Sequence, residues 1–201
     1  MSEALPVVYL ARHGETAWSL SGQHTGRTDV PLTERGERQA RIVGERLRGL
    51  TIAKVLSSPS QRAVRTAELA GFHKVAEIVP DLAEWDYGQY EGRRTAEILA
   101  ERPDWQLFRD GCPGGEFPEQ AGARADRVIE RVRTVTGNVL MFSSAHILRV
   151  LAARWLGLEP AAGRYFVLST ASLSVLGHEH NLTEPVIRLW NEAHVEGMSD
   201  R

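Results

Sequence analysis

The sequence predicts an α/β protein, a three-layer α/β/α sandwich with a mostly parallel central sheet. Three observations lead to this prediction. Short apolar runs alternate along the chain with longer segments of helical periodicity. Several of these runs are continuously apolar, as is usual for strands that are buried on both faces. The helical segments between successive strands also allow the strands to run in parallel.

The first half of the chain alternates strand and helix. Residues 7–11 form a continuous apolar run and are expected to be a buried strand. Thr33 is a suitable N-cap for a helix to about residue 50, because its hydroxyl can accept a free backbone N–H. Residues 53–57 are the second expected strand. Pro59 is expected to open a helix that ends near residue 70, since proline suits a first helical turn.

The second half contains one irregular region. Residues 75–79 are the third expected strand, and residues 81–118 are rich in Trp, Gly, Glu and Asp. Only one helix, near residues 95–101, is expected within that region. Periodicity and apolar runs then predict a helix at 118–136, a strand at 138–142, a helix at 147–156 and strands at 173–176 and 186–190.

Length and composition narrow the class of protein. The 201 residues, with a formal net charge of −2, fit a single domain over residues 1–201, with residues 193–201 as a flexible tail. This charge balance argues against binding to nucleic acid or to a membrane surface. Cys112 is the only cysteine, so no internal disulfide is expected. The apolar residues 5–11 are too few to span a membrane, and a cytoplasmic protein is expected.

Polar residues cluster at three expected strand ends. Arg12 and His13 follow the first strand, residues 57–62 follow the second, and residues 143–146 follow the fourth. In sheets of this kind the functional site lies beyond the carboxyl ends of the strands. These three clusters are therefore expected to meet in one site.

His13 has the clearest chemical meaning in these clusters. A neutral imidazole is a good nucleophile for phosphorus, and Gly14 allows a sharp turn directly after it. A transferred phosphoryl group needs fixed positive charge, which Arg12 can supply together with Arg62, Arg65 or both. Taken alone, a histidine at a strand end is more often structural; the joint placement of these residues favours the functional interpretation.

A leaving oxygen also needs a proton, and Glu84 is the candidate donor. Considered alone, Glu84 would be interpreted as an exposed carboxylate in a loop. Trp85 beside it is expected to form an apolar wall that raises the pKa of the Glu84 carboxyl.

Four segments in this order resemble the histidine phosphatase superfamily, the phosphoglycerate-mutase-like proteins. They are residues 12–18, beginning Arg12-His13-Gly14, and residues 24–36, 57–67 and 84–92. The similarity runs from about residue 7 to residue 190. A bare Arg-His-Gly is weak evidence, but four segments in the right order are strong.

The resemblance implies a phosphoglycerate-mutase-like fold, a phosphohistidine intermediate and neither metal nor cofactor. It makes His13 the nucleophile and Glu84 the proton donor. Residues 105–116 resemble the branch that acts on sugar phosphates and related small acids, so a small phosphorylated metabolite is the expected partner. The substrate-binding residues carried over from the family are Arg12, Ser19, Thr25, Gly26, Arg62, Tyr87 and Ser144.

The chain departs from the family after the fourth strand. Ser144 stands where the family has a second pocket histidine, and Ala145 replaces a glycine, which is expected to narrow the pocket. His146 matches a further histidine of this branch, and we expect it to lie outside the position of the missing one. Losing one such donor typically costs about 10²–10³ in rate.

Three interpretations of this departure remain. The chain is a working phosphatase with a modified pocket, a phosphate-ester binding or regulatory protein with residual turnover, or a deliberately altered active-site variant. A phosphoglycerate mutase is less favoured, because no long insertion after Glu84 would cover the pocket. The oligomeric state stays open, with a homodimer as one option, since Trp155 and Trp190 fit either a core or an interface.

Overall fold

A computed structural model describes residues 5–72 and 74–193, so the tail expected at 193–201 lies outside the described residues except for its first. Its centre is a six-stranded sheet in the order β3-β2-β4-β1-β5-β6. The first four of these strands are mutually parallel, whereas β5 is antiparallel to β1 and β6 is antiparallel to β5. The strands are β1 (Val8–Arg12), β2 (Lys54–Ser57), β3 (Ala76–Ile78), β4 (Val139–Ser143), β5 (Leu173–His178) and β6 (Pro185–Glu192).

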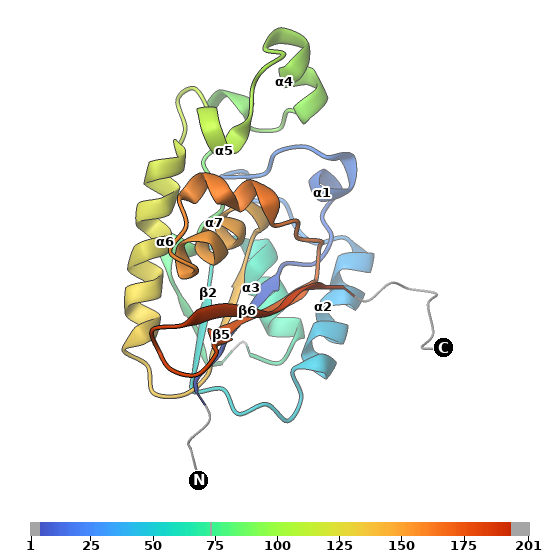
Figure 1. Cartoon of the computed structure of the whole chain (residues 1–201). Coiled ribbons are helices and arrows are strands. Elements are labelled where there is room, and N and C mark those ends of the chain that lie inside the picture. Colours follow the sequence, from blue (N-terminus) through green and yellow to red (C-terminus); the bar gives the residue numbers. More distant parts are fainter. Residues whose placement is uncertain (1–4, 73, 194–201) are drawn as a thin grey trace, which may run out of the picture.

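Helices cover both faces of this sheet (Figure 1). The predicted α/β fold with a mostly parallel sheet is confirmed. Two apolar clusters separate the layers: one packs α2 and α3 against one face, and the other packs α6 and α7 against the opposite face. The helices are α1 (Ala17–Ser21), α2 (Glu34–Arg46), α3 (Gln61–Leu69), α4 (Thr95–Glu101), α5 (Leu107–Asp110), α6 (Pro118–Arg133) and α7 (Ala145–Trp155), with 3₁₀ turns at η1 (Pro80–Leu82), η2 (Gly88–Tyr90) and η3 (Pro160–Tyr165).

Several predicted boundaries were wrong. Helix α3 begins at Gln61 with Ser60 as N-cap, so Pro59 precedes the helix instead of opening it. Helix α7 begins two residues earlier than expected, with Ser144 as its N-cap. Helices α1 and α5 and the three 3₁₀ turns were not predicted, because short helices carry little periodicity. The helix expected at residues 95–101 is confirmed.

The loop after β1 is clamped against helix α2. A Cβ atom on Gly14 would lie 2.3 Å from the Gly36 carbonyl oxygen, and one on Gly36 would lie 2.1 Å from the Glu15 carbonyl oxygen. The Thr33 N–H donates to that same Glu15 oxygen at 2.9 Å. Only glycine at both positions permits this approach, which fixes the backbone on either side of residue 14.

Trp155 and Trp190, which the sequence allowed either in the core or at an interface, differ in burial. Trp155 is buried and donates from Nε1 to the Gly177 carbonyl at 3.1 Å. Trp190 is half-buried, packs against Phe166 and donates to the Val167 carbonyl at 2.8 Å. Trp155 is therefore a core residue. Within residues 5–72 and 74–193, no helix is long and apolar enough to cross a membrane.

Candidate active site

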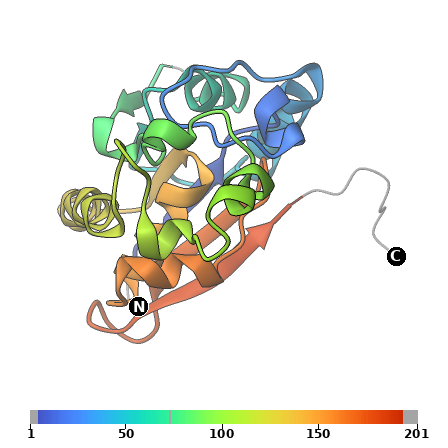
Figure 2. The same cartoon turned by 90° about the horizontal axis from the view of Figure 1, so that it is seen from above.

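The candidate site lies beyond the carboxyl ends of the parallel strands, at the end of the molecule where α1, α4 and α5 gather (Figure 1). Figure 2 views this end from above, with the blue α1 and green α4 segments in front of the sheet. Strand β1 ends at Arg12 and β4 ends at Ser143, and these two residues are paired in register. The predicted meeting of strand-end clusters is confirmed for these two strands.

His13 is the first residue beyond β1. Its backbone N–H donates to the Ser143 carbonyl at 2.9 Å, and its side chain is only 4% exposed. The ring Nδ1 lies 2.7 Å from the Gly14 carbonyl, which can only accept, so Nδ1 carries the proton and Nε2 keeps its lone pair. Burial, aided by the charges of Arg12 and Arg62, lowers the pKa of His13 to about 3. The imidazole is therefore neutral near pH 7.

Two arginines beside His13 are held by backbone carbonyls. Arg12 Nη1 donates to the Leu168 carbonyl at 2.5 Å. The fully buried Arg62 donates from Nη1 to the carbonyl of Thr28 at 3.2 Å, and its Nη2 donates to two more backbone oxygens of the same loop. In the described part of the chain, neither guanidinium forms an ion pair with a carboxylate, and neither Nε has a hydrogen-bond partner. Two positive charges without an ion-pair partner therefore flank His13.

Arg65, the alternative to Arg62, lies elsewhere. It is on the outer side of α3, where it pairs with Glu37 and Glu68 at the surface. Of the two candidates, only Arg62 acts on the pKa of His13.

Glu84 is held by three backbone N–H groups. Its carboxylate accepts from Trp85 at 2.9 Å, from His146 at 3.0 Å and from Ile147 at 2.9 Å. Burial alone would raise the pKa of the Glu84 carboxyl. Hydrogen bonds from the side chain and backbone of His146, together with the Trp85 N–H, outweigh burial and hold this pKa well below its usual range.

The expectation that Trp85 raises the pKa of Glu84 was therefore wrong. The Trp85 ring packs edge-on against Phe108 and donates from Nε1 to the Glu116 carbonyl at 3.1 Å. What meets the carboxylate is the N-terminus of α7, whose free N–H groups and dipole stabilise negative charge.

His146, to which no role was assigned from the sequence, lies on the wall of the same cavity as His13. Because α7 begins at Ala145, residue 146 falls in the first helical turn. Its Nδ1 is 2.6 Å from the Tyr87 hydroxyl and 3.7 Å from a carboxylate oxygen of Glu84. Burial lowers the pKa of His146, and burial together with the neighbouring His146 lowers the pKa of His24 to about 4.

These side chains surround a cavity of about 240 Å³, called here the proximal cavity. Six of the nine predicted site residues line it: Arg12, His13, Ser19, Thr25, Glu84 and Tyr87. Other residues on its wall are Trp18, Gly22, Gln23, His24, Thr95, Ala145 and His146.

The other three predicted residues stand behind that wall. Arg62 grips the loop that carries Thr25 and Gly26. Gly26 lines a neighbouring cavity of about 410 Å³, and a Cβ atom on it would come within 2.5 Å of the Trp85 carbonyl oxygen. Ser144 is buried, and its hydroxyl has no hydrogen-bond partner among the described residues.

The sequence analysis gave no role to several residues on the wall. His24 directly precedes Thr25 and begins the segment 24–36, so its place in the sequence could have identified it as a residue of the site. Thr95 and Trp18 come from α4 and α1, and only the folded chain brings them to the cavity.

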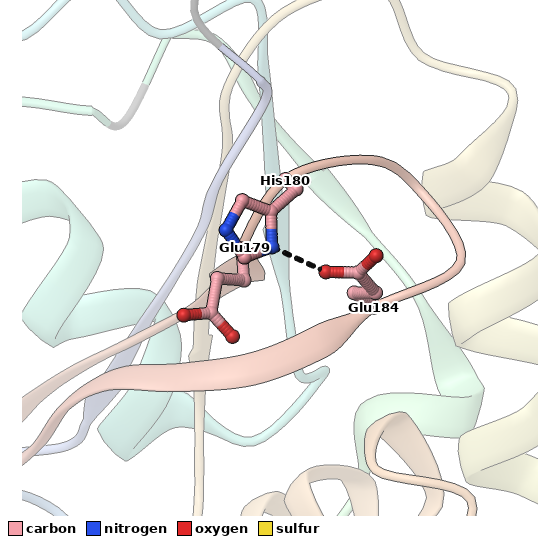
Figure 3. A group of neighbouring side chains, drawn as sticks. All are labelled: Glu179, His180 and Glu184. Atoms are coloured by element: carbon pink, nitrogen blue, oxygen red, sulfur yellow. Dashed lines mark hydrogen bonds and ion pairs between the residues drawn. The ribbon is translucent and has the colours of Figure 1, made fainter.

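One group of described residues outside the cavity has side-chain atoms close enough to share a metal ion. Glu179, His180 and Glu184 lie in the exposed turn between β5 and β6 (Figure 3). His180 Nδ1 is 2.7 Å from a Glu184 carboxylate oxygen, and Asn181 donates to the other oxygen at 2.6 Å. These contacts close the turn at the opposite end of the sheet from His13, since β5 runs antiparallel to β1.

Comparison with known proteins gives consistent similarities. A profile of the histidine phosphatase superfamily (branch 1) matches residues 8–193. The acid phosphatase of Mycobacterium tuberculosis is 42% identical over 179 residues, which cover 87% of this chain and 88% of that protein. The sedoheptulose 1,7-bisphosphatase of Saccharomyces cerevisiae is 37% identical over 191 residues, covering 79% of this chain and 70% of that protein.

Two further similarities concern a mutase and a solved structure. A protein named "Probable phosphoglycerate mutase GpmB" from Photorhabdus laumondii is 34% identical over 186 residues, covering 87% of this chain and 86% of that protein. The solved structure of the open reading frame Rv3214 from Mycobacterium tuberculosis superposes with a TM-score of 0.89 at 39% identity, and covers 94% of this chain and 98% of that one.

Proposed function

The chain belongs to branch 1 of the histidine phosphatase superfamily, and from this premise we propose that it hydrolyses small phosphomonoesters, of the sugar-phosphate kind, through phospho-His13. One observation carries the proposal: a buried, neutral histidine with a free Nε2 is flanked by two arginines that form no ion pair within the described residues. Such an arrangement combines a nucleophile for phosphorus with fixed positive charge for the transferred group.

In the proposed reaction, Nε2 of His13 attacks the phosphorus atom while the bond to the leaving oxygen breaks. Arg12 and Arg62 stabilise the charge on the phosphoryl oxygens. The leaving oxygen takes a proton, and the product alcohol departs. A water molecule then attacks the phosphohistidine, which releases inorganic phosphate and restores the neutral imidazole.

Glu84 is proposed to pass the proton to the leaving oxygen. The free protein holds it as a carboxylate, so the proton has to arrive with the substrate. A phosphomonoester has a second pKa of about 6, and its monoanion therefore brings a proton into the cavity at acid pH. The N–H groups at the start of α7 stabilise the carboxylate that remains after the transfer.

Hydrolysis is favoured over phosphoryl transfer between substrate positions. Two relatives are named as phosphatases, an acid phosphatase and a sugar bisphosphatase. The GpmB relative carries a mutase name, but no long insertion follows Glu84 here to shield a phosphohistidine from water.

A phosphate-ester binding protein with little turnover is the second candidate. The buried Ser144 hydroxyl favours it, because this hydroxyl supplies no contact to the proximal cavity where a second histidine is expected. The enzyme and the binding protein can be distinguished by whether inorganic phosphate is released. Both predict stabilisation by a phosphate ester, but only an enzyme releases inorganic phosphate.

The decisive experiment measures phosphate release from 4-nitrophenyl phosphate and from sugar phosphates. Replacing His13 with Ala is expected to lower turnover on the order of 10³-fold or more, because the covalent route is lost. His180→Ala is the matched control, since that histidine is exposed in the β5–β6 turn. Equal rates for wild type and His13→Ala would refute the nucleophile, and tight binding without release would favour the second candidate.

A further inference from the structure

The backbone that leads into Glu84 is held by one side chain of helix α6, that of Arg124. Nη1 of Arg124 donates to the carbonyls of Asp81 and Ala83 at 2.7 and 2.8 Å. Its Nη2 makes a longer contact of 3.5 Å with the carbonyl of Glu84 itself. Because these contacts are made to the main chain, they fix the segment that carries the carboxylate and leave the carboxylate free for other partners.

Glu116 extends this arrangement to the other side of Glu84. Its carboxylate accepts from Nε of Arg124 at 2.7 Å and from Nη2 at 2.8 Å. The same carboxylate accepts from the Asp86 N–H at 2.9 Å, and the Glu116 N–H donates to the Asp86 carbonyl at 2.9 Å. The Arg124–Glu116 ion pair therefore contacts the main chain both before and after Glu84.

The hydrogen-bonding capacity of Arg124 is fully used by these contacts. An arginine side chain has five N–H donors, and each of the five in Arg124 faces an oxygen of Glu116 or of residues 81–84. The two side chains of the ion pair are only 14% and 16% exposed. The planar, forked guanidinium can serve a carboxylate and several carbonyls at once, which the single ammonium group of a lysine cannot do.

A cavity beside the segment shows why such anchoring is needed. This cavity, of about 410 Å³, has Ala83, Glu84, Asp86, Glu116 and Arg124 in its wall. Glu84 also lines the proximal cavity, so it stands between two spaces. Packing alone therefore leaves the segment room to shift. The N-terminus of α7 holds the carboxylate of Glu84, and the Arg124–Glu116 ion pair holds its backbone.

We propose that Arg124, through its ion pair with Glu116, is a positioning residue that keeps the Glu84 carboxyl group within reach of the leaving oxygen. The inference rests on the proposed function, because it takes Glu84 to donate the proton. Arg124 lines the 410 Å³ cavity and does not line the proximal cavity, so it acts through Glu84 and not on the substrate. A misplacement of about 1 Å at a reacting group can cost on the order of 10²-fold in rate.

The test compares two aryl phosphates whose leaving oxygens differ in their need for a proton. Phenyl phosphate has the shape of 4-nitrophenyl phosphate without the nitro group, and its leaving oxygen is more basic. Arg124→Met is expected to lower kcat/KM for phenyl phosphate about ten- to a hundred-fold and to lower it much less for 4-nitrophenyl phosphate. Purely structural damage would lower both values by the same factor.

Glu84→Gln supplies the reference for this preference. It removes the proton donor and should shift the ratio of the two kcat/KM values in the same direction. In the double variant of Glu84→Gln and Arg124→Met, the ratio should be no larger than in Glu84→Gln alone, because the position of residue 84 no longer matters for proton transfer.

Two further variants serve as control and alternative. Arg127→Met is the matched control on the same helix, since Arg127 pairs with the Asp81 carboxylate at the surface and makes no hydrogen bond to the main chain of the segment. It should leave the ratio unchanged. Glu116→Gln keeps the shape of the side chain and removes its charge. It should shift the ratio by a smaller factor, and it can be measured even if Arg124→Met does not fold.

The outcomes separate this inference from the proposed function. Equal losses for both substrates in Arg124→Met and Glu116→Gln would overturn the positioning role, and so would a ratio in the double variant that exceeds the one in Glu84→Gln. An unchanged ratio in Glu84→Gln would remove Glu84 as the proton donor and the inference with it. The dependence of phosphate release on His13 tests the proposed nucleophile separately, because 4-nitrophenolate leaves without a proton.

Discussion

At the scale of single residues, His13 illustrates what burial does to a titratable group. Its position after the first strand followed from the sequence, because a polar pair ends a continuous apolar run. Its tautomer and pKa did not follow, since they depend on the Gly14 carbonyl and on the charges of Arg12 and Arg62. A sequence identifies the imidazole, whereas the fold determines which of its nitrogens keeps a free lone pair.

These protonation states predict an acid pH profile. Because the pKa of His13 is about 3, the nucleophile stays neutral as the pH falls from 7 to 4. The substrate loses its second proton at about pH 6, and the proton for the leaving oxygen is lost with it. We therefore expect kcat/KM for a sugar phosphate to be level between about pH 4 and 6 and to fall above it, as measured by phosphate release.

An aryl phosphate provides the control for this profile. The 4-nitrophenolate ion leaves without a proton, so the decline above pH 6 should be weaker for that substrate. A profile that instead rises with an apparent pKa near 6.5 would contradict a neutral His13 at acid pH.

Glu84 shows why adjacency in sequence is a poor guide to environment. Trp85 is its neighbour in the chain, yet the indole turns away to Phe108 and leaves only its backbone N–H for the carboxylate. The contacts that set the pKa of Glu84 come from His146 and Ile147, about 60 residues further along the chain. The sequence of residues 82–88 contains no pattern from which these two contacts could be predicted.

At the scale of elements, the start of helix α7 decides which side chains reach the site. The sequence predicted that this helix begins near residue 147, whereas it begins at Ala145. The structure places the cap at Ser144, which buries its hydroxyl and sends Ala145 and His146 to the proximal cavity. His146 therefore reaches the cavity from the first turn of the helix, whereas Ser144 does not line it.

Restoring a histidine at position 144 tests this arrangement. The Ser144 hydroxyl makes no capping bond, so little helix stability is lost when it is replaced. Ser144→His is expected to raise kcat for an aryl phosphate about ten-fold or more, because a missing donor to a phosphoryl oxygen typically costs about 10²–10³ in rate. Ser144→Ala, which removes the unpartnered hydroxyl alone, is the control. No gain in the histidine variant would mean that His146 already supplies the contact.

Long elements were predictable and short ones were not. Every strand and every helix of seven or more residues was expected at nearly its true position, because each shows apolar periodicity over several turns or a clear apolar run. Helices α1 and α5 have five and four residues, and tertiary contacts rather than periodicity define them. Helix α1 also carries Trp18, so that part of the wall of the proximal cavity was not predicted.

At the scale of the whole molecule, net charge and local charge point in different directions. The chain has a formal net charge of −2, and most of its surface arginines are paired with carboxylates. Beside His13, by contrast, Arg12 and Arg62 form no ion pair with any described residue, and their guanidinium groups are held by backbone carbonyls. Composition alone could not reveal this concentration, because it averages over the surface.

Unpaired charge at the site should make folding stability depend on phosphate. Inorganic phosphate that binds the folded chain at a hundred times its Kd contributes about 2.7 kcal/mol of stability. For a protein of this size, that corresponds to a rise in Tm of roughly 5–10 °C in a thermal unfolding assay. The same ionic strength of sodium chloride should give a much smaller rise.

Variants of helix α3 locate this effect. Arg62→Met should abolish most of the phosphate-dependent rise, whereas Arg65→Met, on the outer side of the same helix, should retain it. A full rise in Arg62→Met would contradict the placement of phosphate beside that arginine.

The hydrogen bonds from Arg62 to the loop of residues 25–28 limit which substitutions in that loop would disturb the arginine. The guanidinium contacts only backbone carbonyls of that loop, at Thr25, Gly26 and Thr28. Side chains at the first and last of these positions can therefore change over evolution without disturbing the arginine, while Gly26 is restricted by the Trp85 carbonyl. The fold thus separates the anchoring of the arginine beside His13 from the side chains of the loop, and loop 25–28 is a target for engineering new specificity.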